Sequence, residues 1–282
     1  MGNLSTSQLP PELVAYESTV EESRQDQAAW STGPMPDLQA VLGVLAPLPT
    51  GSVLLGICDD GLPLLLDLKN PSPGSLLLVG DLSPANRNLL RLILASIVLL
   101  HEPGEVDLHL VTDQPEAYRG LLDVPGTIRT HSPFDPRLPE LIRYFASRAN
   151  QRLSGRQASR LAVLGIEDIE TVVSQLSEER LGELTWLAAT GPMEGSWVFA
   201  GLDAAHYGEL DPVLFQAFRT RLVGSSTDRE IAEYLSGLPA AVSSSLDPGV
   251  GYCVKFAGEL IRFWLPRYTV TVQPERRLVK GE

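Results

Sequence analysis

The segment 75–100 constrains the fold most, because an apolar run, a short turn and a long helix pattern follow one another directly. Four apolar residues at 76–79 precede Gly80. Ser83 and Pro84 then form a strong helix start, with serine as the cap and proline at the first helical position. A strand, a glycine turn and a helix in this order are the scaffold of a phosphate-binding loop.

The side chains that would contact a phosphate depart from the pattern G-x-x-x-x-G-K-[ST]. Counting from Gly80, the second glycine, the lysine and the hydroxyl residue are replaced by Ala85, Asn86 and Arg87. Asn86 brings no charge, and Arg87 would project about 100° away from the lysine direction on a helix. Asp81 adds a negative charge beside the phosphates. We therefore predict a lost or much weakened nucleotide site, whose vestige is Gly80, Ser83, Ala85, Asn86 and Arg87.

Composition and charge predict a folded cytoplasmic protein. Of the 282 residues, 44% are hydrophobic and 20% are charged, and no uncharged apolar run is long enough to span a membrane. The formal charge of −13 opposes nonspecific binding to a nucleic-acid backbone, so any such contact would have to be local. Cys58 and Cys253 lie in apolar segments with no second ligand nearby, which favours buried thiols over a zinc site.

Three parts are expected along the chain. Residues 1–36 are polar and end in a Gly-Pro-Met-Pro break, which predicts a mobile arm that orders on a partner. Residues 37–272 form the folded domain, and residues 273–282 form a charged tail. A helix is expected at 37–45. Strands at 52–58 and 62–68 are expected to form a hairpin, because the turn between them ends in Gly61.

From residue 75 onward, strand and helix patterns alternate, which predicts a mainly parallel sheet covered by helices on both faces. The expected strands are 76–79, 106–111, 161–166, 197–200 and 221–225. The expected helices are 84–101, 139–153, 178–189 and 228–235, and a closing hairpin is expected at 252–256 and 260–265.

Several segments, taken in this order, resemble the FtsK/HerA class of P-loop DNA translocases over roughly residues 52–268. They are GICDDGLPLLLDL, EVDLHLVTDQPEAY, PELIRYFASRANQRL, RLAVLGIED, SWVFAGLDAAH, RTRLVGSSTDREIAEYL and FAGELIRFWLP. The resemblance implies a P-loop NTPase-like fold of the RecA/FtsK type with flanking β-hairpins. It places Glu167 and Asp168 where the family has the Asp-Glu of its Walker B strand. It also places Asp113 and Asp203 at the ends of two other strands.

Two groups of charged residues suggest a contact surface. Arg148, Arg152, Arg156 and Arg160 recur every fourth residue, although Ser154-Gly155 interrupts the helix, and a solvated helix end is the favoured interpretation. The resemblance implies that Asp228 and Arg229 pair across a subunit boundary, whereas a cap on their own helix is the commoner arrangement. The interface candidates are Arg148, Arg152, Asp228 and Arg229.

Our interpretation is a non-hydrolysing P-loop-fold protein that binds no cofactor and acts as a structural or regulatory subunit of an assembly. Its partners would be further copies of itself or a related ATPase. Two alternatives stay open. The first is an atypical DNA-stimulated ATPase that uses ATP and Mg²⁺, with Glu167 and Asp168 as its catalytic residues. The second is a sensor that binds a nucleotide at the helix start without cleaving it.

Overall fold

The computed structural model describes residues 35–81, 83–124, 127–153, 160–226, 228–237, 245–256 and 258–268. The predicted arm, apart from its last two residues, and the predicted tail lie outside these ranges. Met35 and Pro36 are attached to the domain, because the carbonyl oxygen of Pro36 accepts a hydrogen bond from the Arg267 backbone amide at 2.7 Å.

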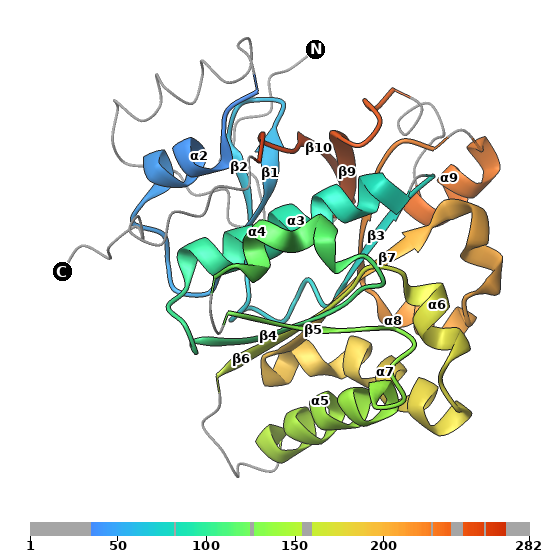
Figure 1. Ribbon diagram of the computed structural model, residues 1–282. Helices are drawn as coiled ribbons and strands as arrows, with labels where there is room; N and C mark the ends of the chain where they lie inside the picture. The colour runs from blue at the N-terminus through green and yellow to red at the C-terminus, as the bar shows by residue number, and fades with distance from the viewer. Residues whose placement is uncertain are drawn as a thin grey trace.

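A single mixed sheet forms the centre of the described domain (Figure 1). Its strand order is β2-β1-β10-β9-β8-β3-β7-β6-β4-β5. The strands from β8 to β5 are parallel to one another, whereas β9, β10, β1 and β2 continue the sheet through antiparallel pairs. The strands are β1 Ser52–Cys58, β2 Pro63–Asp67, β3 Leu76–Gly80, β4 Val106–Val111, β5 Ile128–His131, β6 Leu161–Ile166, β7 Ser196–Asp203, β8 Thr220–Val223, β9 Gly251–Phe256 and β10 Glu259–Trp264.

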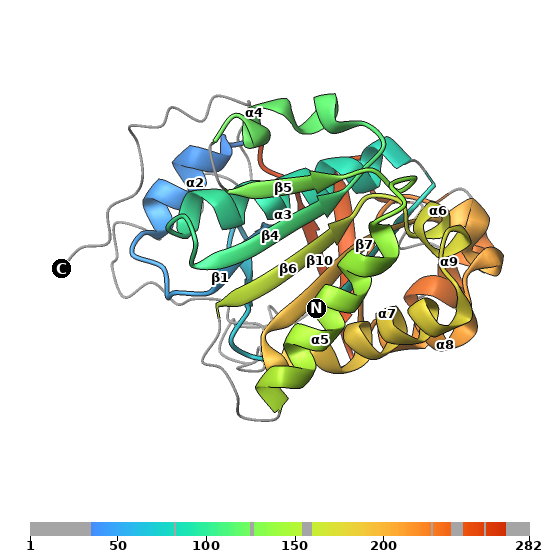
Figure 2. The same ribbon diagram turned by 60° about the horizontal axis from the view of Figure 1, so that its bottom comes forward.

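Helices cover both faces of this sheet, as the alternating pattern predicts. On one face lie α2 (Leu38–Leu45), α3 (Ser83–Leu100) and α4 (Arg119–Leu122), which share a hydrophobic core with β1 and β2. On the other face lie α5 (Leu138–Leu153), α6 (Ile169–Ser174), α7 (Glu178–Thr190) and α8 (Pro212–Ala217), which share a second core. Figure 2 shows α5 and α7 side by side on this face. The remaining elements are α9 (Arg229–Ser236) and three 3₁₀ turns, η2 (Pro115–Tyr118), η3 (Gly191–Glu194) and η4 (Ala204–Glu209).

Strand β3 shows how the sequence forms these two layers. Leu76 and Leu78 point into the first core, while Leu77 and Val79 point into the second. A strand that is buried on both faces needs a continuous apolar run, and this run is what the sequence supplies. The hairpin before it is also confirmed, since Gly61 has a φ of 84° in the turn between β1 and β2.

Strand β5 was not predicted. It is four residues long, lies at the sheet edge and has exposed central residues, so it lacks the apolar run that marks interior strands such as β3 and β6. Strand β7 also extends beyond the expected 197–200, to the whole of Ser196–Asp203.

Buried hydrogen bonds in the middle of α3 and near its start fix the helix to the rest of the domain. Ser96, in the middle of the helix, accepts a hydrogen bond from the Leu54 backbone amide at 2.7 Å. Near its start, the carbonyl oxygen of Ala85 accepts one from the Tyr252 hydroxyl at 2.7 Å. Among the helices of the described ranges, none has the length and apolar character needed to cross a bilayer.

Candidate functional site

The candidate site lies where the carboxyl ends of the parallel strands meet. Gly80 at the end of β3 is paired with Asp203 at the end of β7. Glu167 and Asp168 directly follow β6, and β6 pairs with β7 on the side of β7 that is opposite β3. The first turn of α3 begins just after β3, so its side chains face the same edge of the sheet. Ligands of open α/β sheets bind at this kind of edge.

Arg87 and Glu167 form an ion pair across this edge. The Arg87 Nε donates to Oε1 of Glu167, and the side chains are 16% and 5% exposed. Thr112 directly follows β4, and its hydroxyl donates to the other carboxylate oxygen of Glu167. Both oxygens of Glu167 therefore have partners inside the chain, and the Arg87 charge is compensated where it lies.

Asn86 occupies the lysine position of the loop pattern, and its side chain is buried. Its amide nitrogen donates to the carbonyl oxygen of Leu202 at 2.8 Å, while its Oδ1 has no hydrogen-bond partner. Two glycines lie close to it, because a Cβ atom on Gly80 would lie 3.3 Å from the Asn86 Oδ1 and one on Gly201 would lie 3.6 Å from the Asn86 Cβ. Asn86 thus bridges α3 and β7.

The remaining acidic residues of the site have local structural partners. Asp81 accepts a hydrogen bond from the Ser226 hydroxyl at 2.7 Å. Asp168 caps α6, accepting from the Thr171 amide at 3.1 Å and the Thr171 hydroxyl at 2.7 Å. Burial would raise the pKa of Asp168, but hydrogen bonds from Glu170 and Thr171 outweigh it and hold that pKa below its usual range.

A cavity of about 290 Å³ opens beside Asn86 and is strongly acidic. Its described lining contains five acidic residues and neither lysine nor arginine; the acidic residues are Glu167, Asp168, Glu170, Asp203 and Glu209. Burial and a hydrogen bond to Asp168 raise the pKa of Glu170 to about 9. Glu170 is therefore protonated at neutral pH, and its Oε1 accepts from the Asp203 amide at 2.9 Å. The cavity can receive a cation or a neutral donor more readily than an anion.

The predicted site residues are brought together only in part. Gly80, Ala85, Asn86 and Arg87 lie with Glu167 and Asp168 at this edge, while the side chain of Ser83 lies outside the described part. Sequence reasoning missed Thr112 and Glu170. The resemblance drew attention to Asp113, which is exposed, whereas its neighbour Thr112 binds Glu167. The signal that could have identified Thr112 is its position as the first residue after the expected strand at 106–111.

The interface candidates lie away from this edge or at its margin. The Arg148 side chain is 15% exposed and donates to Asp107 at 2.8 Å and to the Arg160 carbonyl oxygen at 2.7 Å. Asp228 caps α9 by accepting from the Ile231 amide at 3.1 Å. The side chains of Arg152 and Arg229, and residues 154–159 between the two ends of the arginine stripe, lie outside the described part. Their role at an interface stays a prediction.

Comparison with solved structures identifies the fold. The chain is similar to the cytoplasmic domain of the type VII secretion ATPase EccC of Thermomonospora curvata, with a TM-score of 0.65 and 18% identity over 83% of this chain and 32% of that one. It is also similar to the conjugation coupling protein TcpA of pCW3, solved with ATPγS, with a TM-score of 0.62 and 13% identity over 77% of this chain and 66% of that one. This is a P-loop NTPase fold.

A third solved structure, described only as an ATPase, matches with a TM-score of 0.59 and 15% identity over 98% of this chain and all of that one. The chain thus spans about a third of the EccC structure and the whole of this smaller one. No protein-family model matches the chain, and no curated protein matches it. At these identities the comparisons establish the fold, and the chemistry must be argued from the site.

Proposed function

We propose that this chain is a degenerate member of the FtsK/HerA class that does not hydrolyse nucleotides. The Arg87–Glu167 ion pair carries the proposal. A site that hydrolyses Mg·ATP needs a cation aimed at the phosphates and an oxygen ligand for the metal, because its catalysis consists of positioning and electrostatic stabilisation. Here the cation of the loop is engaged by the carboxylate at the Walker B position.

The surroundings of the pair support the same proposal. The Asn86 amide nitrogen donates to the Leu202 carbonyl oxygen, and the neutral side chain offers a phosphate no positive charge. A triphosphate beside it would face the acidic lining of the 290 Å³ cavity. Like charges at this distance oppose binding. We infer that these residues do not fit Mg·ATP.

The biological role that we propose is structural or regulatory, in an oligomeric assembly in the cytoplasm. The partner would be a second copy of this chain or an active, related ATPase. Support comes from similarity to EccC, whose solved fragments include one with ATPases 2 and 3 in a single structure. In that protein a domain of this fold is one unit among several, and we extend the arrangement to this chain.

Calorimetry and turnover measurements test the proposed loss of nucleotide chemistry. We expect no heat of binding with ATP, ADP or GTP in the presence of Mg²⁺, and no phosphate release above that of a buffer control. Turnover that disappears in Glu167→Gln or Asp168→Asn, but persists in the exposed control Asp113→Asn, would establish an ATPase instead. Binding without turnover would establish a nucleotide sensor.

The assembly role needs a separate measurement. We expect light scattering across a concentration series to show self-association, or affinity purification from the native lysate to recover a related ATPase in a fixed ratio. A protein that is monomeric at high concentration and recovers no specific partner would contradict this part of the proposal. The nucleotide result would still stand, because it depends on the site alone.

A further inference from the structure

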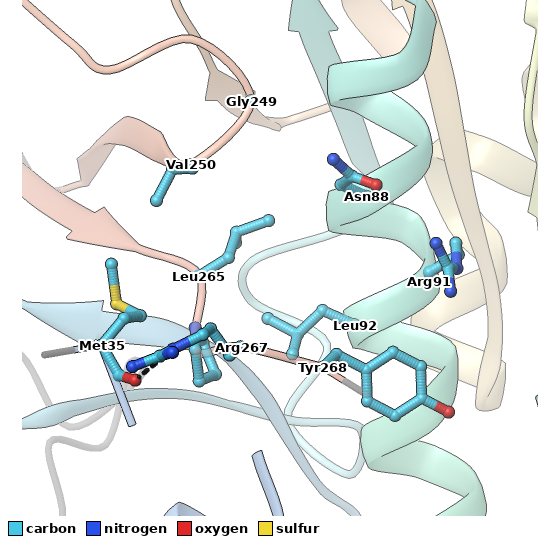
Figure 3. Close-up of a pocket in the computed structure, with 10 residues that line it drawn as sticks. Met35, Asn88, Arg91, Leu92, Gly249, Val250, Leu265, Arg267 and Tyr268 are labelled. Atoms are coloured by element: carbon cyan, nitrogen blue, oxygen red, sulfur yellow. Dashed lines mark hydrogen bonds between the residues drawn. The ribbon is translucent and has the colours of Figure 1, made fainter. Parts of the chain in front are cut away.

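A second cavity, of about 350 Å³, lies against another face of α3 (Figure 3). Asn88, Arg91 and Leu92 of the helix form one wall, while the segments before β9 and after β10 form the other. Asn88 lies two positions beyond Asn86, so its side chain projects about 200° further round the helix than that of Asn86. This cavity is therefore separate from the acidic cavity, and its volume lies within the range of small-molecule sites.

The lining combines an apolar surface with two guanidinium groups. Leu92, Val250 and Leu265 face the hollow in Figure 3, and Arg91 and Arg267 lie at its margin. The described lining residues include no carboxylate, although the chain as a whole carries a formal charge of −13. The two cavities beside α3 thus have opposite electrostatic character, and an anion is attracted to this one.

Arg91 supplies an unused hydrogen-bond donor here. Its Nε is buried and has no partner in the described structure, and its guanidinium lies 5.8 Å from the ring centroid of Tyr268. The Tyr268 hydroxyl is also buried and has no hydrogen-bond partner in the described structure. Burial raises the pKa of Tyr268 to about 12, so the hydroxyl stays protonated. A buried donor without an acceptor is unfavourable, and an acceptor oxygen of a ligand can remove this penalty.

Arg267 has a different part in the cavity. Its Nε donates to the carbonyl oxygen of Met35 at 2.8 Å, and this hydrogen bond joins the segment after β10 to the first described residues of the chain. The bond fixes one wall and leaves the positive charge in place. Arg91 is consequently the group best suited to contact a ligand directly.

We propose that this cavity binds a small organic anion, in which a carboxylate or phosphate group is attached to an apolar body. Arg91 contacts the charged end by a charge-assisted hydrogen bond, and Leu92, Val250 and Leu265 cover the apolar body. The site is independent of the nucleotide question, because it uses another face of α3 and none of the residues of the acidic cavity.

Titration of the full chain with four probes tests the proposal. Benzoate and phenyl phosphate represent the two anionic groups on an apolar ring, benzamide is the neutral counterpart, and inorganic phosphate lacks the apolar body. We expect at least one aromatic anion to saturate the protein, with benzamide and inorganic phosphate at least about tenfold weaker. Comparison of the two aromatic anions shows which charged group the cavity prefers.

Three variants locate the binding. Arg91→Gln should weaken the aromatic anion at least about tenfold, the effect of one lost charge-assisted hydrogen bond. Val250→Trp should abolish binding by filling the cavity from its partly exposed rim. Arg129→Gln is the matched control, because the Arg129 side chain is 69% exposed and lies on the edge strand. This variant should bind the aromatic anion with unchanged affinity. Melting curves confirm that each variant folds.

Several results would overturn the proposal. They are the absence of saturation by any aromatic anion at millimolar concentration, equal affinity for benzamide, and affinity that survives both Arg91→Gln and Val250→Trp. Inorganic phosphate that binds as tightly as phenyl phosphate would indicate a simple surface ion site. None of these outcomes depends on whether the chain binds nucleotides or assembles.

Discussion

Arg87, the fifth residue of α3, is ion-paired with Glu167, which directly follows β6 and lies 80 residues later in the chain. The pair joins the helix after β3 to a strand two places away in the sheet, across β7. Each of the two charged side chains thus has its ionic partner within the fold. The contact also makes the two residues interdependent in stability.

Removing one member of this pair should destabilise the protein strongly. We expect Arg87→Met and Glu167→Gln each to lower the free energy of unfolding by about 2–4 kcal/mol, because each leaves a buried group without its partner. In the double variant no charge is left uncompensated, so its loss should be clearly smaller than the sum of the two. Urea unfolding of the four proteins measures this coupling. Additive losses would show that the two side chains do not interact in solution.

The protonated Glu170 predicts an unusual pH dependence. Its pKa is raised from 4.5 to about 9, so at neutral pH the folded chain holds a proton that the unfolded chain releases. Stability therefore falls as the pH rises from about 4.5 to 9. A glutamine side chain at this position would mimic the protonated acid without this cost. We expect Glu170→Gln to be more stable than the natural chain by about 1–3 kcal/mol at pH 8.

The comparison of the two proteins across pH supplies the control. The advantage of Glu170→Gln should shrink toward pH 5, where both side chains are neutral in the folded and, increasingly, in the unfolded state. Thermal unfolding from pH 5 to 9 measures it. A constant difference across this range would mean that Glu170 does not titrate with a raised pKa.

Asp107 should contribute stability with the opposite pH dependence. Hydrogen bonds from His109 and Tyr144, together with the nearby Arg148 charge, hold its pKa well below the usual range in spite of burial. A carboxylate with a depressed pKa stabilises the fold above about pH 4, and this contribution is lost as the pH falls further. We expect Asp107→Asn to lower the unfolding free energy by about 1–2 kcal/mol at pH 7. The difference should narrow below pH 4 in urea titrations.

Arg148 offers a related test of its two predicted roles. Because it donates to Asp107 and to the Arg160 carbonyl oxygen, Arg148→Gln should lower the melting temperature while leaving the oligomeric state unchanged. Light scattering at matched concentration distinguishes the outcomes. Loss of association without loss of stability would assign Arg148 to an interface, as the arginine spacing first suggested.

The sequence predicted the interior of the fold better than its edge or its site. β6 has the expected bounds because a doubly buried strand is written as an unbroken apolar run, and β4 has them although Asp107 and His109 alternate with its apolar residues. β5 has one neighbouring strand and exposed central residues, so the short edge strand carries no such signal. The strand-end position of Glu167 was predictable, whereas its bonds to Arg87 and Thr112 were not. They depend on the angle at which α3 leaves the sheet, and residue spacing does not specify that angle.

The two cysteines provide a final prediction that needs no variant. Burial, with the charges of Asp60 and Asp59, raises the pKa of the Cys58 thiol to about 12, and burial raises that of Cys253 to about 11. Thiol reagents attack the thiolate, so both residues should react at least about 100-fold more slowly at pH 8 in the folded chain than in urea. A chromogenic disulfide reagent measures both rates, and free glutathione is the reference thiol. Rapid reaction of one thiol in the native protein would show that its strand opens locally, and mass spectrometry would identify which strand it is.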